Sequence, residues 1–119
     1  MNVLFLSPHY PPEMPAFVQG LADIGVSVIG VGDQPLGNLP GHVQDAMCAY
    51  IEVSSLFDEN AVLARVKQIM RRSPVHRIEA LWEPLVMTAA KMRVAFDVPG
   101  MTPDIVNGFR DKSVMKTRL

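Results

Sequence analysis

The N-terminal stretch constrains the fold of this chain more than any other part of the sequence. Asn2–Ser7 contains an unbroken run of apolar, β-prone residues, and the proline-rich loop Pro8–Glu13 ends that run abruptly. An apolar run without polar alternation is typical of a strand that is buried on both faces of a parallel sheet. The loop after such a strand lies at the carboxyl edge of the sheet, where open α/β folds bind their ligands. We therefore expect the functional site to include this loop.

Composition limits the class of protein. With 119 residues, of which 49% are hydrophobic and 19% charged, the chain is large enough for one domain with its own core. Eleven Lys and Arg are matched by 12 Asp and Glu, which argues against a nucleic-acid partner. No apolar run approaches the ~20 residues that a membrane span needs. Cys48 is the single cysteine, so we interpret it as a small buried hydrophobe and expect a cytoplasmic protein.

Strand and helix signals alternate along the chain, which is typical of βαβ units. Apolar residues recur at helical spacing over 14–24, 59–72 and 83–98, and a short helical turn is expected over 42–47. Further strands are expected at 26–31, 50–53 and 77–82, and further helices at 102–109 and from 111 onward. The predicted fold is therefore a Rossmann-like, three-layer, doubly wound α/β sheet of four or five mainly parallel strands.

The turn after the first strand lacks the glycines of a dinucleotide site. Glycines allow backbone N–H groups to approach a pyrophosphate at a helix N-terminus. Pro8, Pro11, Pro12 and Pro15 remove four such donors here, so we do not expect NAD or FAD at this turn. Gly30–Gly32 is only half of the glycine motif and follows a different strand, so we interpret it as a turn.

Several side chains near the expected carboxyl edge can contact a substrate. His9 can act as an acid or base near neutral pH, Tyr10 lies beside it, and Glu13 can instead cap the next helix. Asp33 ends the second strand, where nucleotide folds place ribose-binding carboxylates. Glu83 follows the fourth strand and can either bind an amine or hydroxyl of a substrate or cap its own helix. The sequence predicts His9, Tyr10 and Glu83 as substrate contacts, and leaves their structural roles open.

The C-terminal stretch Gly108–Lys116, with Pro99–Thr102 upstream, resembles the segment that joins the N-terminal domain of ATP-grasp enzymes to their ATP-binding half. The resemblance is to the pre-ATP-grasp domain of carbamoyl phosphate synthase-like and biotin carboxylase-like proteins. It implies a domain over 1–109, with 110–119 beginning a linker helix into a further ATP-grasp domain. We accordingly expect the chain to be the first part of a longer protein.

That resemblance also implies an activity. ATP would phosphorylate a carboxylate, and an amine would then displace the phosphate. Lys112 matches the lysine that commonly reaches nucleotide phosphate in that superfamily. Glu83 stands at the position of the protein carboxylate that contacts the substrate. ATP and magnesium are expected in the full-length parent, held mostly by residues outside this chain and not tightly by this chain alone. No catalytic residue and no metal ligand is assigned within it.

Two alternatives from other classes stay open. The stretch Leu4–Glu13 is also similar to the opening of GT-B glycosyltransferases that use nucleotide sugars, although Met14–Ala16 stands where those enzymes usually have a Gly-Gly pair. The third reading is a stand-alone α/β binding domain without catalysis. The partners considered are small-molecule carboxylates and amines, the ATP-grasp domain of the same chain, and a second copy in a homodimer.

Overall fold

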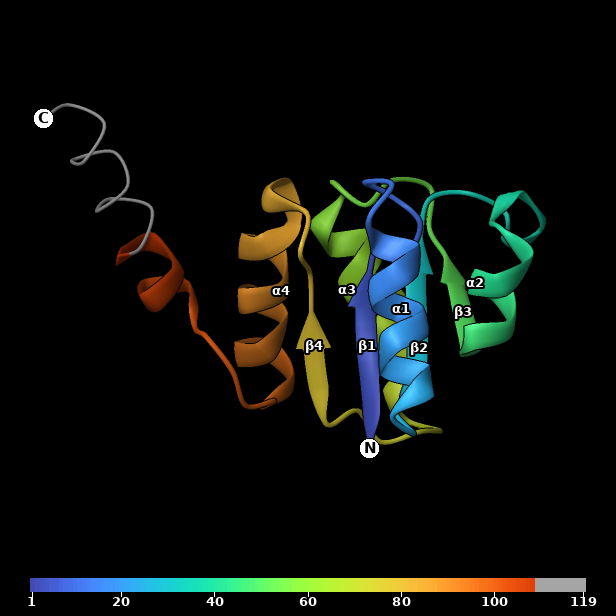
Figure 1. Cartoon of the computed structure of the whole chain (residues 1–119). Helices are drawn as coiled ribbons and strands as arrows, with labels where there is room; N and C mark the ends of the chain where they lie inside the picture. The colour runs from blue at the N-terminus through green and yellow to red at the C-terminus, as the bar shows by residue number, and fades with distance from the viewer. Residues whose placement is uncertain (109–119) are drawn as a thin grey trace, which may run out of the picture.

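The computed structural model describes residues 1–108, which form a four-stranded parallel sheet. The strand order is β3-β2-β1-β4, with the strands at β1 (Asn2–Leu6), β2 (Ser27–Gly32), β3 (Met47–Glu52) and β4 (Arg77–Glu79). The helices are α1 (Met14–Asp23), α2 (Gly41–Ala46), α3 (Glu59–Met70) and α4 (Glu83–Phe96), with a 3₁₀ turn at Leu36–Asn38. Figure 1 shows the strands side by side, with the loop after β1 at the edge opposite the N-terminus.

Helices cover both faces of the sheet and make three layers. On one face, Phe5 and Val28 pack with Met14 and Val18 of α1 and with Val43 of α2. The opposite face packs against α3 and α4; its buried side chains include Leu4, Leu6, Ile29, Val62, Val66, Leu85 and Met92. This arrangement confirms the predicted Rossmann-like α/β fold.

β1 is the centre of the sheet, as the apolar run predicted. It pairs in parallel with β2 on one side and β4 on the other. Val3, Leu4, Phe5 and Leu6 are all nearly inaccessible to solvent. Because side chains alternate across a strand, Leu4 and Leu6 enter one core and Phe5 the other.

The largest differences in strand boundaries from the sequence expectation are in β4 and β3. β4 ends at Glu79, three residues earlier than the expected 82, and β3 begins at Met47 rather than at residue 50. Residues 103–108 are helical, close to the expected 102–109. The helix expected from Asp111, and Lys112 with it, lie outside the described residues.

The turn predicted at Gly30–Gly32 is wrong, because both glycines lie inside β2. The aromatic ring of Tyr50, on the neighbouring β3, lies across them. A Cβ added at Gly32 would overlap the Tyr50 hydroxyl, and one added at Gly30 would overlap the Met47 sulfur and stand 3.2 Å from the Tyr50 ring. The glycines are therefore explained by side-chain packing between neighbouring strands rather than by a turn.

Cys48 is exposed, so the prediction that it is a buried hydrophobe is wrong. The register pairs Val28 with Met47 and Ile29 with Ala49, which leaves Cys48 as the extra residue of a β-bulge. A bulge displaces side chains from the regular alternation, and β3 is also an edge strand of this sheet. The local sequence around Cys48 gives no sign of this irregularity.

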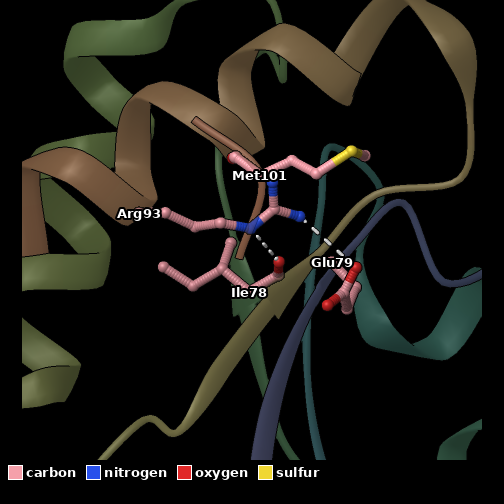
Figure 2. A network of polar contacts seen from close by, with 4 residues as sticks. All are labelled: Ile78, Glu79, Arg93 and Met101. Carbon is pink, nitrogen blue, oxygen red and sulfur yellow. Dashed lines mark hydrogen bonds and ion pairs between the residues drawn. The ribbon is translucent and has the colours of Figure 1, made fainter. Parts of the chain in front are cut away.

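A buried arginine closes the other edge of the sheet (Figure 2). Arg93 of α4 is 6% exposed, and its Nε donates to the Ile78 carbonyl oxygen of β4 at 2.9 Å. Its Nη1 donates to the Met101 carbonyl at 2.8 Å, and its Nη2 pairs with Glu79 Oε2 at 3.3 Å. The guanidinium thus binds the edge of β4 that pairs with no other strand of this sheet. It also connects the segment after α4 to β4 through the Met101 carbonyl.

Candidate functional site

The loop after β1 is held in a fixed conformation at the carboxyl edge. Ser7 adopts a left-handed backbone with φ of 59°, which is uncommon outside glycine, and it is almost completely buried. Its N–H donates to the Val31 carbonyl at 2.8 Å, and its Oγ donates to the Tyr10 carbonyl at 2.6 Å. The Tyr10–Pro11 peptide bond is cis. These contacts fold the loop back over the end of the strand, which sets the positions of His9 and Tyr10.

The start of α1 needs no side-chain cap. Glu13 occupies the N-cap position, but its side chain makes no capping hydrogen bond. The Met14 N–H instead donates to the Pro11 carbonyl at 2.9 Å. The capping role considered for Glu13 is therefore wrong for its side chain.

The loop after β2 forms the second wall of the site. The Tyr50 hydroxyl donates to the Gln34 carbonyl at 2.5 Å and so anchors this loop to β3. Burial raises the pKa of the Tyr50 hydroxyl, and the negative charges of Glu52 and Asp33 add to that rise. Tyr50 is therefore a neutral donor at physiological pH. Asp33, directly before Gln34, is half-buried beside it.

Aromatic side chains form the third wall. The rings of Tyr10 and Trp82 are 5.0 Å apart at an interplanar angle of 81°, an edge-to-face contact. Phe57 contacts Trp82 at 5.6 Å and 60°. Tyr10 and Phe57 are each more than half exposed, so this cluster faces solvent rather than a core.

The loop after β1, the loop after β2 and the aromatic side chains border a cavity of about 390 Å³ at the carboxyl edge of β1, β2 and β4. That volume lies in the range of small-molecule sites. The residues that line it come from the two loops, from the segment before α3 and from the N-cap of α4: Ser7, His9, Tyr10, Asp33, Gln34, Asn38, Leu56 and Trp82.

His9 contributes a polar atom that the described part of the chain leaves unused. Its Nδ1 is buried and has no hydrogen-bond partner among residues 1–108. A buried polar atom without a partner costs free energy, and a ligand or water that pairs with it recovers that cost. The structure thus brings His9 and Tyr10, two of the residues predicted from sequence, into one cavity.

Glu83 lies close to this cavity but does not line it. Trp82 is the N-cap of α4, so Glu83 is the first residue of the helix rather than its cap. Glu83 is exposed. A carboxylate in the first turn is favourable for the helix dipole. The assignment of Glu83 as a substrate contact stays a prediction. The assignment of Lys112 as a contact of nucleotide phosphate also stays a prediction.

Sequence reasoning missed Trp82, Gln34, Asn38 and Leu56 as parts of the site. Trp82 was taken as the last residue of a strand, yet it immediately precedes Glu83 at the edge where a ligand was expected. A tryptophan at the expected carboxyl end of a strand, directly before Glu83, is a sequence signal that could have identified it. Asn38 and Leu56 carry no comparable signal, because their approach depends on how two long loops fold.

A second hollow, of about 460 Å³, lies near the C-terminus of α3 and is lined mainly by arginines. Arg65, Arg71 and Arg72 line it, and α3 runs from the carboxyl edge of the sheet toward the amino edge. These three arginines therefore lie away from the carboxyl-edge cavity. Among residues 1–108, no group of three or more His, Cys, Asp or Glu side chains is placed to hold a metal ion.

The fold and the edge cavity together define a Rossmann-like α/β domain with a ligand-sized site at the carboxyl ends of its strands. Among solved structures, the chain is similar to an L-amino acid ligase from Bacillus licheniformis, with a TM-score of 0.65 and 23% sequence identity. The match covers 85% of this chain and 25% of the ligase, so the chain spans about a quarter of that enzyme's length. No family model and no curated protein matches the chain. Among residues 1–108, no helix is both long and apolar enough to cross a membrane.

Proposed function

We propose that this chain is the N-terminal, substrate-side domain of an ATP-dependent carboxylate–amine ligase of the ATP-grasp type. The observation that carries the proposal is the shared fold with an L-amino acid ligase over 85% of the chain. The Asp111–Lys112 pair and the upstream Pro99–Thr102 support it independently, because they stand where ATP-grasp enzymes join their N-terminal domain to the ATP-binding half. The finer resemblance, to carbamoyl phosphate synthase-like and biotin carboxylase-like proteins, is part of the proposal.

The proposed reaction has two steps. A carboxylate oxygen of the first substrate attacks the γ-phosphorus of ATP, which forms an acyl phosphate and releases ADP. The nitrogen of the amine substrate then attacks the acyl carbon, loses a proton, and displaces inorganic phosphate to leave an amide. The phosphate carries away one oxygen atom of the original carboxylate.

The described residues suit the substrate side of this reaction better than the nucleotide side. Prolines replace potential N–H donors in the loop after β1, and residues 1–108 offer no cluster of metal-binding side chains. The proposal assigns the metal and most ATP contacts to a further domain of the parent protein.

Lys112 is the phosphate contact that the proposal assigns to this chain. Lys112→Ala in the parent protein should raise the KM for ATP and leave the fold intact. Lys116→Ala is the matched control, because it removes the same charge four residues later in the sequence and is assigned no contact. Equal KM values for the two variants would contradict the assignment.

The experiment that tests the proposed function is an ADP-release assay on the full-length protein purified from its source. Pairs of L-amino acids are supplied with ATP and magnesium, and ADP is measured for each pair and for each amino acid alone. The proposal predicts ADP and amide in equal amounts for at least one pair. Turnover of a nucleotide sugar would favour the glycosyltransferase reading, and binding without any turnover would favour a stand-alone binding domain.

A further inference from the structure

The cavity at the carboxyl edge carries a specific chemical character. Among its lining residues, Asp33 is an ionisable carboxylate, and neither lysine nor arginine is present. His9, Gln34 and Asn38 add polar groups that can donate or accept hydrogen bonds. A ligand carboxylate or phosphate placed here would meet Asp33 without a fixed cation to offset it.

The aromatic wall of the cavity, like Asp33, favours a positively charged ligand. Tyr10 and Trp82 stand at 81° to one another, so their rings form a corner rather than a flat stack. Ring faces attract cations, and tryptophan does so most strongly. Asp33, Tyr10 and Trp82 line the same cavity, so a small cation bound there is offered both a carboxylate and aromatic side chains.

An apolar residue completes the cavity. Leu56 is 2% exposed and is one of the residues that line the cavity. A volume of about 390 Å³ accommodates a molecule the size of an amino acid. The lining therefore offers one anionic contact, an aromatic corner and an apolar surface within one small site.

We propose that this cavity binds the amine substrate, in the form of a small ammonium compound with an apolar side chain, through Asp33 and the Tyr10–Trp82 corner. The inference rests on the proposed ligase function and assigns one of its two substrates to a site. The inference concerns binding; the bound ammonium group must still lose a proton before its nitrogen attacks the acyl phosphate. The reacting carboxylate of the acyl donor and the phosphates of ATP belong elsewhere, because Asp33 would repel both anionic groups.

The single tryptophan of the chain makes the test direct. Trp82 is the only tryptophan in the sequence, so its emission reports on this cavity without interference. The 119-residue chain is titrated with L-leucinamide, which has an ammonium group and no carboxylate, at a pH below the pKa of that amine. N-acetyl-L-leucine, which has a carboxylate and no ammonium group, and adenosine are titrated in parallel.

L-leucinamide should change the Trp82 emission saturably, while N-acetyl-L-leucine and adenosine should not. Asp33→Asn should weaken the binding of L-leucinamide at least about tenfold, since a charged hydrogen bond is lost. Glu52→Gln is the matched control, because it removes a nearby exposed carboxylate that does not line the cavity. Its affinity should stay within about twofold of the unmodified chain.

A second variant keeps the test decisive if Asp33→Asn does not fold. Tyr10 is 51% exposed, so Tyr10→Leu should fold normally and weaken L-leucinamide binding by about three- to tenfold. Absence of L-leucinamide binding, equal binding of N-acetyl-L-leucine, or saturation by adenosine instead would each overturn the inference. If the parent protein releases ADP but no amine binds in this cavity, only the assignment of the amine site is contradicted. If an amine binds here but the parent protein releases no ADP, only the proposed ligase function is contradicted.

Discussion

Arg93 Nε donates a hydrogen bond to the Ile78 carbonyl oxygen at 2.9 Å, and this bond joins the last described helix of the core to an edge strand. The guanidinium is buried, and its remaining nitrogens reach the Met101 carbonyl and the Glu79 carboxylate. Gly100 permits this contact, because a Cβ there would stand 2.7 Å from Arg93 Cδ and Nε. The arginine therefore acts as a structural clamp at the edge of β4, remote in role from the carboxyl-edge cavity.

Arg93→Met should lower the free energy of unfolding by about 2 to 4 kcal/mol, because the buried Ile78 carbonyl and the partly buried Met101 carbonyl lose their donor. Lys91→Met is the control on the same helix. Its ion pair with Glu59, at 3.3 Å, is largely exposed, so we expect a loss below about 1 kcal/mol. Urea unfolding followed by circular dichroism measures both. Similar losses in the two variants would show that the clamp adds nothing beyond a surface ion pair.

Gly32→Ala should destabilise the chain by about 1 to 3 kcal/mol, because the added methyl group must displace the Tyr50 hydroxyl from β2. Gly37→Ala provides the comparison, since a Cβ at Gly37 meets no atom within 4 Å. That variant should stay within about 0.5 kcal/mol of the unmodified chain. A stable Gly32→Ala variant would mean that Tyr50 does not need to lie across β2.

The raised pKa of Tyr50 predicts a loss of stability at alkaline pH. The unfolded tyrosine ionises near its ordinary pKa of about 10, before the folded one does. The stabilising contribution is therefore complete below about pH 10 and is lost as the pH rises through the folded pKa. Unfolding free energies measured from neutral pH to about pH 11 should fall less steeply for Tyr50→Phe than for the unmodified chain. Parallel pH profiles would contradict the assigned environment of Tyr50.

Local patterns were sufficient to predict most of the fold. The apolar run at the N-terminus predicted a central strand, and β1 is buried on both faces. Asp58, directly before the helix expected at 59–72, is a residue type that favours an N-cap, and its side chain accepts a hydrogen bond from the Ala61 N–H at 3.2 Å. Such features depend on neighbours within a few residues, which is why a single sequence reveals them.

Features that depend on distant residues were not predictable in the same way. Gly30 and Gly32 were interpreted as a turn because the ring that requires them belongs to Tyr50, on another strand. Cys48 was placed in the core because nothing local predicts a β-bulge. In the candidate site, His9 and Tyr10 follow from their place after β1, whereas Asn38 and Leu56 reach the cavity only through loop folding.

If the parent protein activates a carboxylate as an acyl phosphate, one oxygen atom of that carboxylate must leave with inorganic phosphate. This is tested by supplying the full-length protein with an ADP-releasing pair of L-amino acids in which both carboxylate oxygens of the acyl donor are ¹⁸O. We expect each turnover to transfer one ¹⁸O atom into inorganic phosphate, which mass spectrometry detects. Unlabelled phosphate, or ¹⁸O in AMP instead, would contradict it.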